Sequence, residues 1–412
     1  MIGISKLYCG AIEASDALRY KRRTETLPNG LLRFARDKKP VVVWNCTKTC
    51  NLRCRHCYAE SDGCAHDQLS TTEAKALIDD LAAFGSPALL LSGGEPCMRD
   101  DLVEIAAYAR KAGLRVTLST NGTLIDAELA RELARVDLSY VGISLDGGPE
   151  THDRFRGMPG AFERAMRGVA NAKEAGMKVG LRFTIHQQNY REVDTVFDIM
   201  RDYNVDRVCF YHLVYTGRGS DMMNLDLTHD QTRAVMRLIM DRTRAWFDEG
   251  GTPEVLTVDN HADAPFLYLE LLREDPARAA KVLKLLQYNQ GSSTGNGIAC
   301  VSWDGEVHAD QFWRHFSFGN VRERPFSQIW TDTSRTTKAS ELMFRLKDKR
   351  PFVKGRCASC RWLDICGGNF RVRAEAATGD LWAPDPACYL TDEEIAPHAD
   401  DPAPMLERPH YE

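Results

Sequence analysis

The sequence predicts an α/β protein whose larger part is a partial (β/α)6 barrel, followed by a smaller C-terminal region with its own cluster of cysteines. Three observations support this fold class. Short runs rich in Val, Ile or Leu alternate with amphipathic helical segments between residues 41 and about 214. There are six such strand-and-helix units, fewer than the eight of a full barrel. Cysteines gather after the first strand and again beyond residue 355.

Six short apolar segments are predicted as strands, because each suits burial on both faces of a parallel sheet. They are Val41–Cys46, Ala88–Ser92, Arg115–Ser119, Tyr140–Leu145, Lys178–Ile185 and Asp206–Leu213. The helices between them are predicted at Thr72–Phe84, Asp101–Ala112, Asp126–Arg135, Ala161–Ala175 and Tyr190–Tyr203. Capping signals such as Ser70 with Glu73 mark several helix starts.

The rest of the chain is divided by composition. A hairpin is expected at Ile298–Trp303 and Glu306–Ala309, around Asp304-Gly305. A Pro28-Asn29-Gly30 turn lies in the N-terminal arm. The expected parts are an arm (1–40), the barrel (41–227), a helical insert (228–290), the cysteine-containing domain (291–395) and a flexible tail (396–412).

Composition excludes several classes of protein. The 412 residues can form a barrel-sized domain and a smaller one, and 43% apolar with 27% charged residues is typical of a globular chain. The net charge of −5 argues against a nucleic-acid binder. No run approaches the roughly 20 apolar residues of a membrane span, and the first residues do not resemble a signal peptide. We expect a cytoplasmic monomer whose thirteen cysteines ligate metal rather than form disulfides.

Three cysteines, Cys50, Cys54 and Cys57, follow the first predicted strand. Their thiolates can hold three irons of a [4Fe–4S] cluster and leave the fourth iron open. An open iron can bind S-adenosylmethionine and pass it an electron, which yields a 5′-deoxyadenosyl radical. A zinc knuckle is the weaker alternative, because it would show two ligand pairs, whereas only His56 stands nearby.

This cysteine motif resembles that of the radical S-adenosylmethionine (radical SAM) superfamily, and the resemblance extends over most of the chain. The motif Gly93-Gly94-Glu95-Pro96 follows the second strand unchanged. In this family it contacts the amino end of the methionine part of the cofactor.

The resemblance also assigns cofactor contacts further along the chain. Asn121 would lie near the cofactor, Ser144 would bind a ribose hydroxyl, and Arg156 would pair with the methionine carboxylate. Tyr58 would pack along the adenine. The alternatives are a strand-end serine, a surface arginine and an ordinary core tyrosine.

A second set of cysteines, Cys357, Cys360, Cys366 and Cys388, resembles the SPASM/Twitch branch of this superfamily. Four ligands would close a second [4Fe–4S] cluster, suited to electron transfer, and a four-thiolate zinc site is the alternative. The full SPASM pattern has further cysteines for a third cluster. Asp310 and Phe370 stand at such positions and Cys300 does not fit the spacing, so we expect one auxiliary cluster.

Strings at both ends of the chain resemble the AhbD heme synthases of the siroheme-dependent heme pathway and, less closely, NirJ. They are Ile4–Gly10, Ser15–Tyr20, His308–His315 and Phe318–Arg322. The resemblance implies oxidative decarboxylation of two propionates of iron-coproporphyrin III to vinyl groups, which gives protoheme. It also implies an electron donor such as ferredoxin or flavodoxin, and an electron acceptor.

The substrate's propionates need cations and its iron a possible axial ligand. Candidates in the expected regions are His212, Arg218, His308, Arg314 and His315. Two alternative activities stay open: NirJ-like removal of propionates from didecarboxysiroheme, and peptide maturation. Only about forty residues precede the first strand, whereas many maturases carry a larger peptide-recognition domain there. A non-catalytic iron–sulfur carrier would not need the motif at Gly93–Pro96.

Overall fold

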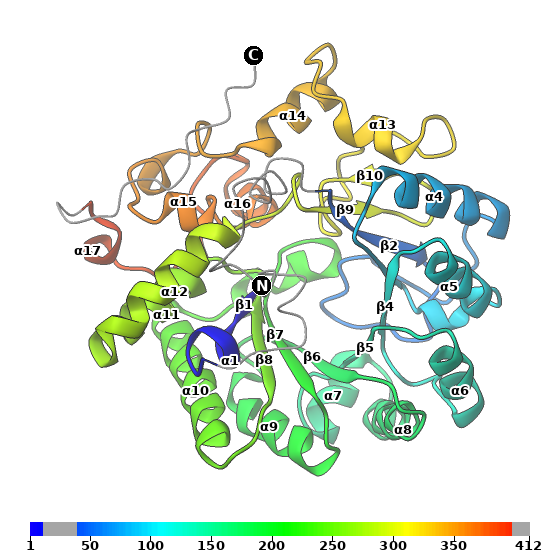
Figure 1. The fold of residues 1–412 in the computed structure, drawn as a ribbon, viewed down its shortest axis with the longest axis horizontal. Helices are drawn as coiled ribbons and strands as arrows, with labels where there is room; N and C mark the ends of the chain where they lie inside the picture. Colours follow the sequence, from blue (N-terminus) through cyan, green and yellow to red (C-terminus); the bar gives the residue numbers. More distant parts are fainter. Residues whose placement is uncertain (11–38, 398–412) are drawn as a thin grey trace. The chain divides into compact units, whose positions relative to one another are not determined.

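The computed structural model describes residues 1–10 and 39–397, which form two compact units (Figure 1). One unit contains residues 39–227 and 294–347, and we call it the barrel unit. The other contains the N-terminus, residues 228–293 and the chain from residue 348, and we call it the cysteine unit. The predicted turn at Pro28, the string Ser15–Tyr20 and most of the predicted tail lie outside the described residues.

The barrel unit contains six parallel strands that pair in sequence order, which confirms the predicted fold class. They are β2 (Val41–Thr47), β3 (Ala88–Gly93), β4 (Arg115–Thr120), β5 (Tyr140–Ser144), β6 (Val179–Ile185) and β7 (Arg207–His212). The predicted hairpin is also present, as β9 (Ile298–Val301) and β10 (Val307–His308). It extends the sheet because β9 pairs in parallel with β2.

Helices connect these strands and lie around them in Figure 1. They are α4 (Thr71–Phe84), α5 (Leu102–Lys111), α6 (Ala127–Arg135), α7 (Pro149–Arg156), α8 (Ala161–Glu174) and α9 (Val193–Asp202). Short helices complete the unit: η2 (Pro96–Met98), η3 (Tyr190–Glu192), η4 (Gly217–Leu225), α13 (Phe326–Thr331) and α14 (Lys338–Lys347). The expected capping box is formed, since Ser70 Oγ accepts from Glu73 N (3.3 Å) and the Glu73 carboxylate accepts from Ser70 N (2.8 Å).

The two faces of the barrel sheet differ in character. On β7, Phe210 packs against Phe197 of α9 and Phe183 of β6, so these rings define the helix-covered outer face. Side chains alternate along a strand, which directs Arg182 and Thr184 of β6 to the opposite, inner face. These two are partly exposed, whereas Leu181, Phe183 and Ile185 are buried. The inner face is therefore the accessible one along β6.

The cysteine unit is mainly helical. Its elements are β1 (Ile2–Gly3), α1 (Ile4–Leu7), α10 (His229–Asp248), β8 (Glu254–Val258), α11 (Asp263–Glu274), α12 (Pro276–Asn289), η5 (Gly355–Cys357), α15 (Leu363–Cys366), α16 (Arg371–Thr378) and α17 (Asp392–Ile395). The predicted helical insert at 228–290 also contains a strand, β8, which pairs antiparallel with β1. Ser5 fixes this contact: its hydroxyl donates to Pro253 O and accepts from Val255 N, each at 2.7 Å.

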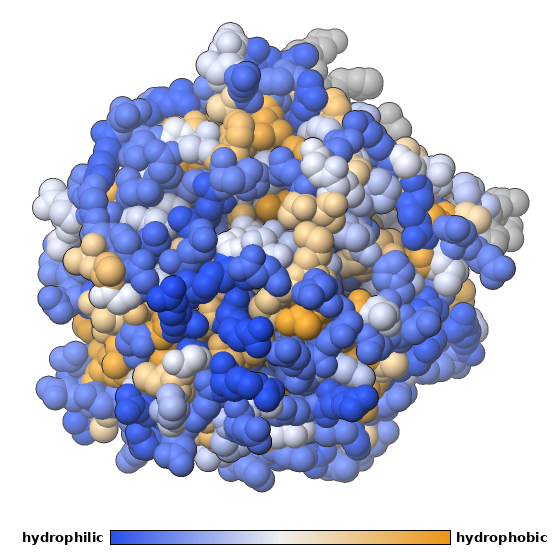
Figure 2. Space-filling model, turned by 180° about the vertical axis from the view of Figure 1, so that it is seen from behind, coloured by the Kyte–Doolittle hydropathy of each residue, from blue (hydrophilic) through white to orange (hydrophobic). Residues whose placement is uncertain are grey.

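Exposed apolar side chains are few and scattered in the described residues. The face shown in Figure 2 is mainly hydrophilic, with apolar residues in small separate patches. The large apolar side chains that are exposed are Met1, Met98, Leu124, Tyr203, Met223 and Leu272. Within residues 1–10 and 39–397, no helix is long and apolar enough to cross a bilayer.

Candidate active site and auxiliary cluster site

The loop after β2 brings the three predicted cluster ligands together, two of them buried and Cys57 partly buried. Cys50 and Cys54 are each 8% exposed and pack together with Cys57. Burial raises the pKa of Cys50 to about 12 and also raises that of Cys54. The neighbouring thiols contribute to both shifts, which shows that their sulfurs are close to one another.

Two N–H groups already point at these sulfurs. Leu52 N donates to Cys50 Sγ and Arg156 Nη1 donates to Cys54 Sγ, both at 3.4 Å. Such donors stabilise a thiolate and the negative charge of an iron–sulfur cluster. In the described residues no three His, Cys, Asp or Glu side chains are arranged to hold a single metal ion. The donor set, two buried thiols that accept N–H···S contacts and the partly buried thiol of Cys57, fits the predicted cluster.

Two arginines expected to bind substrate brace the cluster loop. Arg218 donates from Nε to Cys54 O (2.8 Å) and from Nη1 to Ser61 O (3.0 Å). Arg314 donates from Nη1 to Ala59 O (2.6 Å) and lies over the Trp303 ring. Their guanidinium groups are thus engaged with backbone carbonyls, and a substrate role for either stays a prediction.

The two glycines of the Gly93–Pro96 motif permit contact with the cluster loop. A Cβ atom on Gly93 would lie 2.4 Å from Thr47 O, and one on Gly94 would lie 2.2 Å from Thr49 O. Gly93 also has a φ of +136°, which disfavours any other residue. Pro96 then begins η2 and is buried. The close approach is to the protein backbone that shapes the loop.

Glu95 of this motif is fully buried and joins β3 to β4. Its carboxylate accepts hydrogen bonds from Thr120 Oγ1 and Asn121 N, each at 2.7 Å, and from Cys97 N at 3.1 Å. Burial raises the pKa of Glu95, and these hydrogen bonds oppose the rise. Asn121 continues the link, because its Nδ2 donates to Asn51 Oδ1 on the cluster loop at 2.8 Å.

Arg156 ends α7 and forms a buried ion pair that the sequence did not reveal. Its Nε lies 2.6 Å from Asp146 Oδ2, and the two side chains are 7% and 0% exposed. The Asp146 carboxylate and the Cys54 thiol raise the pKa of Arg156 against the effect of its burial. Arg156 therefore lies next to a cluster ligand, and its pairing with the methionine carboxylate stays a prediction.

The remaining cofactor candidates lie on the inner side of the sheet. Tyr58 donates to Asn45 Oδ1 (3.0 Å) and its hydroxyl is 3.2 Å from Ser92 Oγ. Ser144 ends β5 and is partly exposed. Both remain predicted contacts of the cofactor.

The three candidate histidines occupy different surroundings. His308 is buried with Nδ1 2.8 Å from Phe316 O and Nε2 2.9 Å from Ser302 Oγ, and burial lowers its pKa. His212 ends β7 and is buried, whereas His315 is exposed and stacks on Trp313. Exposure leaves His315 accessible to a ligand, whereas both ring nitrogens of His308 are within hydrogen-bonding distance of protein groups.

The four predicted auxiliary ligands come together in the cysteine unit. Cys357 ends η5, Cys366 ends α15, and Cys360 and Cys388 lie in loops. The charges of Cys388, Cys357 and Cys360 all contribute to raising the pKa of Cys366, so the four thiols lie near one another. Arg371 is close enough to oppose this rise. A positive charge next to four thiolates suits a ligated iron–sulfur cluster.

The three residues at or near the positions expected for a third cluster's ligands make contacts with other protein groups. Asp310 is buried and accepts from Thr294 Oγ1 at 2.6 Å. Cys300, on β9, is buried next to Asn45 Nδ2 at 3.5 Å. Phe370 precedes α16, and its backbone N–H donates to Asp385 at 2.9 Å.

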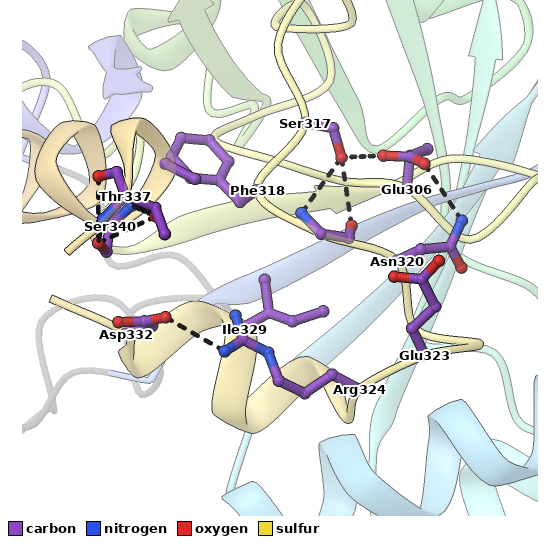
Figure 3. A pocket seen from close by; sticks show the side chains of 12 residues that line it. Glu306, Ser317, Phe318, Asn320, Glu323, Arg324, Ile329, Asp332, Thr337 and Ser340 are labelled. Atoms are coloured by element: carbon purple, nitrogen blue, oxygen red, sulfur yellow. Dashed lines mark hydrogen bonds and ion pairs between the residues drawn. The ribbon is translucent and has the colours of Figure 1, made fainter. Parts of the chain in front are cut away.

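A cavity of about 460 Å³ in the barrel unit contains none of the predicted site residues (Figure 3). Its lining includes the carboxylates of Glu306, Glu323 and Asp332. Its arginine, Arg324, is paired with Asp332 at 3.2 Å. This excess of carboxylates does not suit a polycarboxylate ligand.

Comparison with known protein families identifies two domains in this chain. Residues 44–209 match the Radical SAM superfamily model, and residues 293–361 match the SPASM model, described as an iron–sulfur cluster-binding domain. The solved structure described as "Native anSMEcpe with bound AdoMet" shares the fold, with a TM-score of 0.65 at 19% identity over 85% of this chain and 94% of that one. The predicted cofactors are confirmed: S-adenosylmethionine with a [4Fe–4S] cluster, and an auxiliary iron–sulfur cluster.

Three relatives align over most of this chain. The "Fe-coproporphyrin III synthase" of Methanosarcina barkeri is 61% identical over 96% of this chain and 99% of the relative. The "Pre-heme d1 synthase" of Dinoroseobacter shibae is 41% identical over 86% and 87%. The "AdoMet-dependent heme synthase" of M. barkeri is 33% identical over 84% and 95%.

Proposed function

Because this chain belongs to the radical SAM superfamily, and within it to the family of heme-biosynthetic enzymes, we propose that it removes whole acetate side chains from an iron tetrapyrrole and thereby forms iron-coproporphyrin III. The observation that supports iron-coproporphyrin III as the product, rather than the substrate, is the 61% identity to a protein named for making this porphyrin. The chain is a radical SAM oxidoreductase, and the predicted role in heme synthesis is confirmed at the level of the family.

The second candidate is the reaction expected from the sequence, in which iron-coproporphyrin III is the substrate and protoheme the product. The resemblance of residues 308–315 and 318–322 to AhbD and the 33% identity to a heme synthase favour it. Both candidates share the same porphyrin, the same enzyme class and the loss of carboxylates. They differ in whether iron-coproporphyrin III is released or consumed.

The site residues support this chemistry in distinct ways. Cys50, Cys54 and Cys57 would hold the cluster, and S-adenosylmethionine bound there supplies the 5′-deoxyadenosyl radical. Arg156 would neutralise part of the negative charge at Cys54, to which it donates a hydrogen bond. Glu95 fixes the loops after β3 and β4 against each other. Our proposal includes an electron carrier such as ferredoxin or flavodoxin as donor, an electron acceptor, and a monomeric enzyme.

The test uses the anaerobic holoenzyme with S-adenosylmethionine, dithionite and one tetrapyrrole at a time, followed by mass spectrometry. We expect didecarboxysiroheme to yield iron-coproporphyrin III. Conversion of iron-coproporphyrin III to a monovinyl species and then protoheme, each step with the mass of formic acid lost, would instead establish the second candidate. No change in either tetrapyrrole, with normal cleavage of S-adenosylmethionine, would refute both.

A further inference from the structure

Arg182 is a cation on the inner face of the barrel sheet, and no residue that the structure describes is its anionic partner. It lies in the middle of β6 and is partly exposed. Its guanidinium stacks 4.8 Å above the Tyr211 ring of β7. In the part of the chain that the structure describes, its guanidinium makes no hydrogen bond or ion pair with another residue. Arg218 and Arg314 differ from it because they donate to backbone carbonyls.

The groups that act most strongly on Arg182 are phenols and thiols. The titratable groups that act most strongly on it are Tyr211, Tyr140, Cys209 and Tyr58, and none of them is a carboxylate. Phenols and thiols are ordinarily protonated at neutral pH. An arginine whose strongest neighbours carry no negative charge attracts an external anion, and its planar fork matches a carboxylate.

Two glycines make room for this group. A Cβ atom on Gly142 of β5 would lie 2.9 Å from Arg182 Cδ. One on Gly180 of β6 would lie 2.3 Å from the hydroxyl of Tyr140. Glycine inside a strand weakens it and marks a close approach. Both glycines thus allow the large inner-face side chains of Tyr140 and Arg182 to occupy this position.

Arg182 also lies near the expected cofactor. It pairs in register with Ser144 across β5 and β6, and Ser144 is the predicted ribose contact. Its charge acts on the Tyr58 hydroxyl, which follows the last cluster cysteine. A ligand group bound to Arg182 would therefore lie close to the place where the radical forms.

We propose that Arg182 binds a carboxylate side chain of the iron tetrapyrrole and sets which part of the substrate faces the cofactor. This inference rests on the proposed function, because it takes a polycarboxylate tetrapyrrole as the ligand. It does not depend on the direction of the reaction, since iron-coproporphyrin III is a ligand in both candidates.

The experiment measures binding of iron-coproporphyrin III to the anaerobic holoenzyme by the change in its Soret band. Arg182→Gln should raise the dissociation constant at least tenfold, about the effect of losing one charge-assisted pair. Arg182→Lys should cause a smaller loss because it keeps the charge. The matched control, Arg131→Gln, removes an exposed arginine of α6 and should leave binding unchanged. The tetramethyl ester of the porphyrin should bind wild type and Arg182→Gln equally.

Each outcome decides one point. A wild-type enzyme that does not bind the porphyrin refutes the proposed function, whereas unchanged binding to Arg182→Gln refutes only the role of Arg182. Loss of S-adenosylmethionine cleavage without porphyrin would assign Arg182 to the cofactor and also overturn the inference. If Arg182→Gln does not retain its iron, the test uses the wild-type enzyme only. Equal affinity of the wild-type enzyme for the free-acid porphyrin and for its tetramethyl ester would then contradict a carboxylate contact.

Discussion

Replacing Asp146 with Asn tests whether the buried ion pair holds the cluster-binding loop together. Asp146 is fully buried, its Oδ2 lies 2.6 Å from Arg156 Nε, and Arg156 in turn contacts Cys54 Sγ at 3.4 Å. The variant keeps the shape of the side chain but leaves a buried guanidinium without its carboxylate. Removing one partner of a buried pair costs about 3–5 kcal/mol. The negative charge of a bound cluster would compensate part of this loss, so we expect about 3 kcal/mol in the holoprotein.

The assay is urea unfolding of the anaerobic holoprotein, followed by circular dichroism. The matched control is Asp137→Asn, which breaks the ion pair of Asp137 with Arg110 at a site where Asp137 is 82% exposed. An exposed pair contributes about 0–1 kcal/mol, so this control should behave like wild type. If Asp146→Asn also lost less than about 1 kcal/mol, the ion pair would not stabilise the loop, and our account of Arg156 would be wrong.

Three further predictions concern the two clusters and one buried histidine. Cys54→Ala should lower the iron content by about one cluster and abolish 5′-deoxyadenosine formation in dithionite, and unchanged formation would exclude this triad as the active cluster. Cys360→Ala should still cleave S-adenosylmethionine yet give little tetrapyrrole product, whereas zinc in place of the additional iron of anaerobically purified protein would contradict an auxiliary iron–sulfur cluster. His186 stacks on Phe155 at 4.2 Å, and burial lowers its pKa to about 4. The unfolded chain therefore takes up a proton first as the pH falls, so His186 should cost roughly 3 kcal/mol of stability between pH 6.5 and pH 4. His186→Phe should flatten the urea midpoint over this range, and an unchanged slope would show that His186 does not titrate on unfolding.

The sequence alone was sufficient to predict features that depend on short stretches of residues. The six strands of the barrel agree with the prediction to within one residue at each end, because apolar runs and turn signals define them. The cysteine triad and the capping box of Ser70 at the start of α4 were also recognisable from short sequence patterns. Strand β8 was missed because its partner, β1, lies about 250 residues earlier in the chain. No pattern within a short window contains that pairing.

The side-chain roles at the site depended on contacts between distant segments. The sequence indicated that Arg218 and Arg314 were cations near the strand ends, but not that backbone carbonyls of the cluster loop would accept from them. Asp146 was visible in the string Ser144-Leu145-Asp146 without any sign that it pairs with Arg156. Gly142 and Gly180 were a signal that the sequence did offer. Glycine is unfavourable inside a strand, so its presence there indicates that a bulky neighbouring side chain needs room on the inner face.

The central claim is that this chain forms iron-coproporphyrin III by removing acetate side chains from an iron tetrapyrrole through radical SAM chemistry. The most direct measurement is mass spectrometry of the tetrapyrroles after anaerobic incubation of the holoenzyme with S-adenosylmethionine, reductant and didecarboxysiroheme, with Cys54→Ala as the inactive control. Our account predicts iron-coproporphyrin III together with 5′-deoxyadenosine, and neither product from Cys54→Ala. Intact didecarboxysiroheme, with vinyl products formed from iron-coproporphyrin III instead, would contradict it.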